Sequence, residues 1–127
     1  MPAVAFDDIT VHAESRGRRY GSDGDYLRSP AGAMGEWQVM PATARDPGYG
    51  ITPWNGTPDD LARVGKQYQD AMYREYNGDP AKMWAAYNAG PGRLNKAIRS
   101  GGDNWLAQMP KETRDYVRNN MRRLRGQ

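Results

Sequence analysis

The apolar residues of the chain recur mainly at the three- and four-residue spacing of amphipathic helices. The clearest stripe follows Thr57 and Pro58, which suit the cap and the first position of a helix, and two aspartates that favour its first turn. The apolar positions of this stripe are Leu61, Val64, Tyr68, Ala71, Met72 and Tyr76. Because Asn77 and Gly78 follow it, the pattern predicts a long helix that ends at about residue 76.

A second helix is predicted to begin at Asp79 and Pro80, which repeat the combination of a capping residue and a proline. It is expected to stop near Gly90, where two glycines flank a proline. Apolar residues between positions 94 and 98 then predict one or two further turns before the glycines at 101 and 102.

Helices are also predicted at both ends of the chain, over residues 6–15 and 110–125. A weaker pattern predicts a short helix over residues 37–44 that is interrupted at Pro41. Residues 18–32 and 46–56 are rich in turn-forming residues, so they are expected to form long loops, the first of them with at most a small hairpin.

The predicted fold is therefore all-α, a compact helical domain with long surface loops. A length of 127 residues suits one domain, with a core over about residues 6–120 and a basic end over 121–127. No apolar run reaches the length of a spanning helix, and the first twenty residues lack the features of a secretory signal. As written, the chain is not expected to export itself.

Composition limits the chemistry that the chain can perform. There is no cysteine, which excludes disulfides, thiolate nucleophiles and cysteine-based zinc sites. The single histidine, His12, excludes a multi-histidine metal site and is expected to be structural or exposed. No metal and no cofactor is therefore expected, and catalysis has to use carboxylates, hydroxyls and amides.

The formal net charge of +3 comes from the C-terminal end, where residues 111–127 hold six basic and two acidic side chains. The rest of the chain is close to neutral. A nucleic-acid-binding protein more often spreads lysine and arginine over a whole face, so a solvated last helix is favoured over a nucleic-acid interface.

Glu14 is the first candidate for chemistry, since it falls at the end of the predicted first helix. A carboxylate lodged against apolar neighbours has a raised pKa, which suits a general acid. Taken alone, most glutamates at helix ends are simply solvated. Three further segments, 29–38, 86–90 and 112–117, favour a functional role for Glu14 instead. They place hydroxyl, amide and tyrosine groups beside small residues.

Four tryptophans and eight tyrosines accompany a single phenylalanine, and aromatic rings with a polar group can stay partly wet. Such rings commonly line carbohydrate sites, where they stack on sugars. Trp37, Trp54 and Tyr49 lie in predicted loops and are expected to line a groove. Trp84, Tyr68 and Tyr76 lie in predicted helices and are instead expected to be part of the hydrophobic core.

Taken together, these segments resemble the soluble lytic transglycosylases, a goose-lysozyme-like family. The resemblance rests on Glu14-Ser15, on Ser29-Pro30-x-Gly32-Ala33-x-Gly35-x-x-Gln38, on Ala86-Tyr87-Asn88-Ala89-Gly90 and on Glu112-Thr113-x-x-Tyr116-Val117. The order and spacing agree over about residues 6–120, and the Ala-Tyr-Asn-Ala-Gly run is the most specific part. The resemblance implies a lysozyme-like helical fold that cleaves the β-1,4 bond between N-acetylmuramic acid and N-acetylglucosamine in peptidoglycan.

The resemblance also implies a role for each matching residue. Glu14 corresponds to a single general acid and base, where ordinary glycosidases use two carboxylates. In this family the substrate's own acetamido group stabilises the reacting centre, and the product is a 1,6-anhydro sugar. The substrate-binding positions would be Ser29 and Gln38 near the N-acetyl group, Tyr87 and Asn88 at the reacting centre, and Tyr116 near the catalytic glutamate.

The sequence departs from the family pattern in two places. Glu36 and Trp37 occupy positions that are usually an aliphatic residue and methionine, and Glu36 is expected to face solvent or to pair with an arginine. The stretch between Glu14 and Ser29 is also longer than in many members. Its aspartates, at 23 and 25, are either turn residues or positions that hold a water, and the second case would make the protein a hydrolase.

Two competing functions follow from these departures: a hydrolytic muramidase on the same fold, and a non-catalytic wall-binding or virion structural module. The expected partner is the glycan strand of peptidoglycan. The domain is expected to be monomeric, alone or within a larger protein or particle. Arg18 and Arg19 either meet anionic peptide stems of the wall or form a solvated pair. The protein is expected to act in the periplasm or cell wall, although the chain shows no secretory signal. Delivery by a phage particle, or as part of a larger exported protein, is therefore expected.

Overall fold

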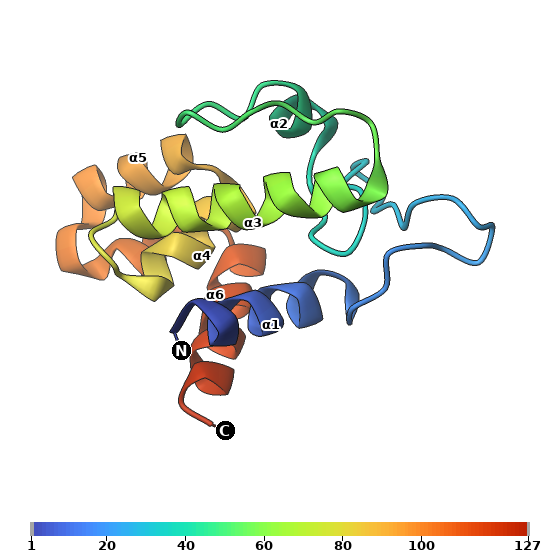
Figure 1. Cartoon of the computed structure of the whole chain (residues 1–127). Helices are drawn as coiled ribbons and strands as arrows, with labels where there is room; N and C mark the ends of the chain where they lie inside the picture. The colour runs from blue at the N-terminus through green and yellow to red at the C-terminus, as the bar shows by residue number, and fades with distance from the viewer. Residues whose placement is uncertain (1, 127) are drawn as a thin grey trace. The chain divides into compact units, whose positions relative to one another are not determined.

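A computed structural model describes residues 2–126 of the chain, with their side chains from residue 6 onward. Helix accounts for 62% of it and strand for 4% (Figure 1), which confirms the predicted all-α class with at most a small hairpin. The elements are α1 (Pro2–Ser15), α2 (Pro41–Arg45), α3 (Pro58–Glu75), α4 (Pro80–Ala89), α5 (Pro91–Gly101), the 3-10 helix η1 (Gly102–Gln108) and α6 (Lys111–Leu124). None of the helices in this described part has both the length and the apolar character needed to cross a membrane.

The capping signals in the sequence place the starts of α3 and α4 as predicted. The hydroxyl of Thr57 accepts a hydrogen bond from the Asp60 backbone N at 3.3 Å. At α4 the Asp79 carboxylate accepts one from the Lys82 backbone N at 3.2 Å, with Pro80 in the first position. In both cases a side-chain oxygen satisfies a backbone N–H that the first helical turn leaves without a partner.

Gly90 ends α4 as expected, with a φ of 94° that a residue with a side chain rarely adopts. Pro91 then starts α5 at once, and α5 runs for 11 residues, which is longer than the one or two turns predicted. Leu94 and Ala97 are buried on its inner face and extend the helix. Neither the loop signals nor the glycines predicted the 3-10 helix η1, which buries Trp105.

The predicted helix over residues 37–44 is wrong in its first half. Only α2 is helical there, and Pro41 begins it instead of interrupting it. Residues before a proline prefer extended backbone, and Met40 has φ −68° and ψ 143°. Val39 pairs with Met34 through two backbone hydrogen bonds of 2.9 and 3.0 Å, which a helix at this point would not allow.

Short backbone pairings organise the long segment between α1 and α2. Isolated antiparallel bridges join Tyr20 to Tyr26, Arg28 to Met34 and Met34 to Val39. This agrees with the prediction of an ordered loop with a small hairpin.

The chain forms two compact units, residues 1–68 and 69–127, and each is described by itself. The core of the first includes Phe6, Met34, Trp37, Val39, Ala44, Leu61 and Val64. In the second, α4 packs against both α5 and α6 and is buried on all sides at residues 83–86. Trp84 is fully buried, which confirms its place in the core, whereas Tyr68 and Tyr76 are only half-buried.

One close approach in the first unit depends on a glycine. A Cβ at Gly65 of α3 would lie 2.5 Å from the Cβ of Trp37. Trp37 is therefore packed onto the helix backbone, and only 7% of it is exposed. It belongs to the core, with its accessible edge in a shallow pocket beside α1, rather than to a loop groove.

We expect Gly65→Ala to lower the free energy of unfolding by about 1–3 kcal/mol, because Trp37 or α3 has to move to make room for the methyl group. Gly92→Ala is the matched control, since a Cβ there meets nothing within 4 Å and alanine favours a helix. Urea unfolding of both variants checks this. Equal stability of the two would contradict the packing of Trp37 on Gly65.

Candidate active site

Glu14 lies one residue before the end of α1 and is half-buried. The next residue, Ser15, is 5% exposed, and its hydroxyl donates to the Glu36 carbonyl at 2.8 Å. The Ser15 hydroxyl oxygen also accepts a hydrogen bond from the Gly17 backbone N at 3.1 Å. Arg16 and Gly17 both have positive φ, so the chain turns sharply away from the helix at this point. The end of α1 is therefore attached to the segment that contains Glu36.

Glu36 is paired with Arg19, which confirms the prediction of an arginine partner. The Arg19 Nε and Nη2 atoms donate to the Glu36 carboxylate, with a shortest distance of 2.8 Å. The Glu36 side chain is 16% exposed, so it is not directed into solvent. Arg19 also binds Asp59 at 2.7 Å, and these two carboxylates raise the pKa of the guanidinium above its usual value. Arg19 is thus not a solvated cation.

Ser29 and Gln38 both lie in the segment that is organised by the Arg28–Met34 and Met34–Val39 backbone pairings. The Ser29 hydroxyl accepts a hydrogen bond from the Ala33 backbone N at 3.0 Å, which leaves its own proton to donate. The Gln38 amide nitrogen donates to the carbonyls of Leu27 and Gly35, at 3.1 and 2.7 Å. Both amide hydrogens are therefore used by the backbone, and the amide oxygen is the atom that can accept from a ligand.

Gln38 has φ 48°, in the left-handed region that glycine favours. Such a conformation costs about 1–3 kcal/mol in a residue with a side chain, and it persists where surrounding contacts over-determine it. The two amide contacts and the Met34–Val39 pairing supply these constraints. The first unit thus holds Gln38 in one orientation, on the turn that begins beside Glu36.

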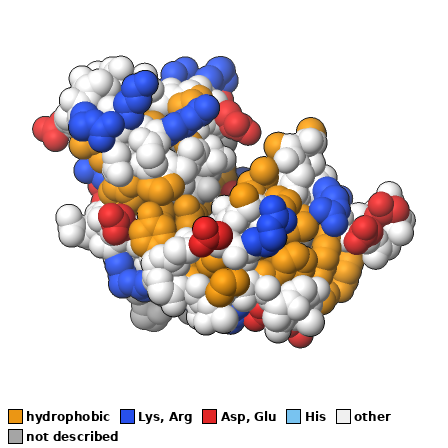
Figure 2. Space-filling model, turned by 90° about the horizontal axis from the view of Figure 1, so that it is seen from above, with side chains coloured by type: hydrophobic (Ala, Val, Ile, Leu, Met, Phe, Trp, Pro, Cys, Tyr) orange, Lys and Arg blue, Asp and Glu red, His pale blue; other side chains and the backbone are white. Residues whose placement is uncertain are grey.

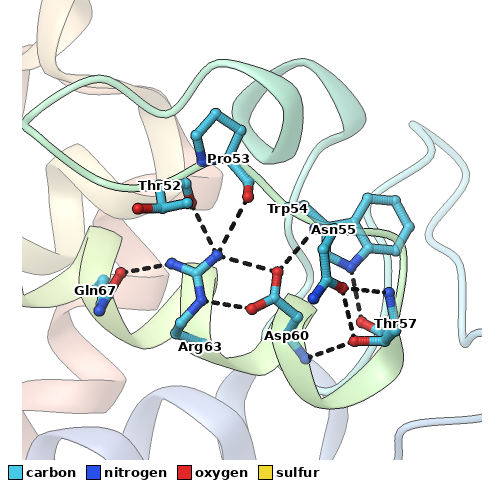
Figure 3. Close-up of polar contacts among 8 residues, drawn as sticks. All are labelled: Thr52, Pro53, Trp54, Asn55, Thr57, Asp60, Arg63 and Gln67. Atoms are coloured by element: carbon cyan, nitrogen blue, oxygen red, sulfur yellow. Dashed lines mark hydrogen bonds and ion pairs between the residues drawn. The ribbon is translucent and has the colours of Figure 1, made fainter.

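The loop before α3 is held by Arg63 and Asp60 (Figure 3). The Arg63 guanidinium donates to both oxygens of Asp60, at 2.6 and 3.0 Å, and to the Thr52 carbonyl at 2.8 Å. The hydrogen bonds from Arg63 are the main reason that the pKa of Asp60 lies below its usual value of 3.8. The hydrogen bond from the Asn55 backbone N lowers the pKa of Asp60 further.

Trp54, expected to line a groove, is half-buried in this loop. Its indole N–H donates to the Thr57 carbonyl at 2.7 Å, and its ring meets Tyr26 edge-on. Tyr49, expected in the same role, is 45% exposed and contacts Tyr68 edge-on. His12 is exposed, as predicted.

Asp23 and Asp25 bind the backbone of their own turn. The Asp23 carboxylate accepts from the Asp25 backbone N at 3.0 Å, and the Asp25 carboxylate accepts from the Tyr26 backbone N at 2.8 Å. Both residues are exposed. These contacts are those of turn residues, which was the first of the two expectations.

In the second unit, the end of α4 is joined to the first turn of α6. The Thr113 hydroxyl donates to the Asn88 side-chain oxygen at 2.8 Å, and Thr113 is 2% exposed. Tyr116 lies one turn further along the same face of α6, and Tyr116 and Tyr87 are both half-buried. Thr113 stands in the segment that carries the family resemblance, which assigned it no role of its own.

The six predicted site residues thus fall into two groups. Glu14, Ser29 and Gln38 belong to the first unit, where the Ser15–Glu36 contact links the end of α1 to the turn that carries Gln38. The residues at 87, 88 and 116 belong to the second unit, where Asn88 is tied to α6. Sequence reasoning missed three residues that organise these groups: Ser15, Arg19 and Thr113.

Known proteins resemble this chain in sequence and in fold. Residues 11–112 match the transglycosylase SLT domain. The chain is 34% identical to the soluble lytic murein transglycosylase of Escherichia coli K12, in an alignment that covers 73% of this chain and 16% of that protein. It is also 34% identical to the membrane-bound lytic murein transglycosylase D of the same strain, covering 72% of this chain and 22% of that protein.

Solved structures show the same fold. The lytic transglycosylase Slt of Pseudomonas aeruginosa, solved as an inactive glutamate-to-glutamine mutant, matches with 31% identity and a TM-score of 0.70. The 70 kDa soluble lytic transglycosylase of Escherichia coli matches with 27% identity and a TM-score of 0.68. Each alignment covers 91% of this chain and 20% of the other, so this chain spans about a fifth of the length of either protein.

We expect Arg19 and Glu36 to be energetically coupled. Arg19→Met leaves a largely buried carboxylate without its main partner, and Glu36→Leu restores the aliphatic residue usual at this position. Each single variant should be less stable than the wild type, and the double variant should recover part of the loss. A double-mutant cycle from urea unfolding should give a coupling energy of about 1 kcal/mol. Strictly additive effects would contradict an energetic coupling between the two side chains.

The lowered pKa of Asp60 makes its contribution to stability depend on pH. A carboxylate with a depressed folded-state pKa stabilises the fold above its unfolded pKa, and this contribution is lost as the pH falls through the folded value. The stability difference between wild type and Asp60→Asn should therefore be larger at pH 6 than at pH 2. Thermal melts at both pH values measure it, with Asp8→Asn as an exposed control. A difference that does not change with pH would contradict the assignment.

Proposed function

The chain belongs to the transglycosylase SLT family, and from this premise we propose that it cleaves the glycan strands of peptidoglycan as a lytic transglycosylase. The reaction is proposed at the β-1,4 bond between N-acetylmuramic acid and N-acetylglucosamine, with Glu14 as the single general acid and base. The observation that carries the proposal is the hydrogen bond between Ser15 and the Glu36 carbonyl. It attaches the helix end that presents Glu14 to the turn that presents the Gln38 amide.

The neighbouring carboxylates support the choice of Glu14. Glu36 and Asp59 are both bound by Arg19, and Asp60 is bound by Arg63. A carboxylate whose oxygens are bound by a guanidinium is already engaged within the protein and is poorly placed to contact a substrate. Glu14 is half-buried at the start of a sharp turn, which suits a group that has to be protonated in one step and ionised in the next.

In the first step, the Glu14 carboxylic acid donates its proton to the glycosidic oxygen, and the bond from that oxygen to C1 of the muramic acid breaks. The acetamido oxygen of the substrate stabilises the positive charge that develops at C1. Glu14, now a carboxylate, then removes the proton from the C6 hydroxyl. The C6 oxygen bonds to C1 and closes a 1,6-anhydro ring, so no water is consumed and Glu14 regains its proton.

The remaining site residues bind and orient the sugar in this proposal. The Gln38 amide oxygen accepts from the acetamido N–H, because its amide hydrogens are already donated to the backbone. The Ser29 hydroxyl donates to a sugar or acetamido oxygen. Tyr87, Asn88 and Tyr116 shape the reacting end, with Asn88 oriented by Thr113. The substrate would place the action of the protein in the cell wall, whether a larger exported protein or a phage particle delivers it.

The first test is mass spectrometry of the sugars released from purified peptidoglycan. Wild type should release muropeptides that are one water lighter than hydrolysed ones. Glu14→Gln should lower their rate of formation by a factor of about 10² to 10⁴, because general acid and base catalysis is lost.

Glu36→Gln is the matched control, and its activity should stay within about fivefold of wild type, since it keeps the backbone carbonyl that binds Ser15 and an amide oxygen that can accept from Arg19. Inactive but folded Glu36→Gln would contradict the assignment of roles. Hydrated products would indicate a muramidase. Binding without products from any variant would indicate a wall-binding module.

A further inference from the structure

Four arginines form a row along one side of α6, the last helix of the second unit. Arg114, Arg118, Arg122 and the C-cap residue Arg125 follow one another at spacings of four, four and three residues. Such spacings place side chains on the same side of a helix, and this arginine row extends for about 16 Å along the helix axis. The family match ends at residue 112, so the arginine row lies beyond the matched domain.

The last three arginines of the row carry charges that no acidic side chain binds. All three are exposed. Among the described residues, Arg118 and Arg125 make no side-chain hydrogen bond or ion pair. Arg122 donates to the side-chain oxygen of Asn119 at 3.0 Å, and this partner is an uncharged amide. Residues 116–126 contain no aspartate or glutamate.

The two acidic residues of α6 lie near its start and leave the arginine row positive. Asp115 is bound by Lys111 at 2.6 Å, so its charge already has a partner. Glu112 lies in the first turn of the helix. Arg114, the first member of the row, donates to the Met109 carbonyl at 3.0 Å and keeps its full charge. The exposed length of the row therefore has a positive electrostatic potential.

The opposite side of α6 is used by the fold. Thr113, Val117 and Asn120 are buried there, and α6 packs against α4. The apolar side of this amphipathic helix is therefore not available to insert into another phase. Packing also fixes the direction in which the arginine row faces, so the row is a permanent feature of the surface of the second unit.

The chemistry of the row favours a surface of phosphate groups. A guanidinium presents a planar set of N–H donors that matches the oxygens of a phosphate. Nucleic-acid interfaces more often spread over a whole face, and single strands are held by aromatic rings, whereas residues 117–126 contain no aromatic residue. A bilayer of anionic phospholipids attracts a group of cations on one exposed helix side without needing either feature.

We propose that the arginine row of α6 is a docking surface for a bilayer of anionic phospholipids, with the guanidiniums bound to the lipid phosphates. Because the apolar side of α6 is buried, this contact is peripheral and electrostatic, and salt should reverse it. The inference goes beyond the proposed function and does not depend on it.

The test is sedimentation of the full chain with two kinds of vesicle: equal parts of phosphatidylglycerol and phosphatidylcholine, and phosphatidylcholine alone. At about 50 mM salt the wild type should bind only the anionic vesicles, and about 1 M salt should release it. Arg118→Gln/Arg122→Gln/Arg125→Gln should lower the affinity about a hundredfold, since each cation near an anionic surface contributes about fivefold. Arg118→Lys/Arg122→Lys/Arg125→Lys keeps the charge and should retain most of the binding.

Arg93→Gln/Lys96→Gln/Arg99→Gln is the matched control, because it removes the same charge from exposed positions of α5. Figure 2 shows Lys and Arg side chains gathered on the left of the view, where α5 lies in Figure 1. Their three-residue steps turn through about a third of the helix circumference, so they do not form a straight row. This variant should bind anionic vesicles within about threefold of the wild type.

Three results would overturn the proposal. The first is a wild type that does not bind anionic vesicles. The second is an equal loss in the two glutamine triple variants, which would show attraction to net charge alone, or no loss in either. The third is tighter binding of the wild type to a DNA duplex than to vesicles of the same phosphate concentration, with that binding lost in the α6 glutamine variant, which would make the partner a nucleic acid.

Cleavage of purified, lipid-free sacculi separates this proposal from the proposed function. The α6 glutamine variant should cleave them at the wild-type rate, which also shows that it is folded. If the wild type binds anionic vesicles but releases no sugars from sacculi, the proposed activity fails and the docking surface stands. If it cleaves sacculi but does not bind the vesicles, only the docking surface fails.

Discussion

The pairing of Glu36 with Arg19 is the interaction on which the first unit depends. A carboxylate whose side chain is 16% exposed has given up most of its hydration, and that loss is tolerable only with a well-placed cation. The backbone of the same residue accepts the Ser15 hydroxyl, at 2.8 Å. Glu36 therefore connects three segments: the end of α1, the loop that carries Arg19 and the turn that presents Gln38.

This pairing also accounts for an acidic residue at position 36, where the family resemblance would lead us to expect an aliphatic side chain. A carboxylate with so little exposure requires a cation, and Arg19, in the stretch before Ser29, supplies it. Arg19 then reaches Asp59 at the start of α3 as well. An aliphatic residue at position 36 would instead pack in place without an ion pair.

Local signals were sufficient to predict most of the helices. Thr57 and Asp79 cap α3 and α4, and each signal acts within four residues of sequence. The turn at 35–38 was not predictable in this way. Its shape depends on the pairing of Met34 with Val39 and on the amide contacts of Gln38 with Leu27, eleven residues away.

The same limit applies to the candidate site. Glu36 was expected either to face solvent or to pair with an arginine, and the choice of Arg19 depends on a contact across 17 residues. The Asn88–Thr113 contact spans 25 residues and joins two helices. Residue type and order were thus visible in the sequence. The hydrogen bonds that orient each group were not, because they form only when distant segments meet.

A reaction that relies on one carboxylate for both proton transfers places a condition on its surroundings. A second unpaired carboxylate nearby would repel negative charge on the first and couple the two titrations. In the first unit, Arg19 binds Glu36 and Asp59, and Arg63 binds Asp60. Each of these three carboxylates therefore has a guanidinium partner within the first unit. The same arginines that order the loops therefore also occupy the carboxylates that would otherwise compete with Glu14 in the proposed reaction.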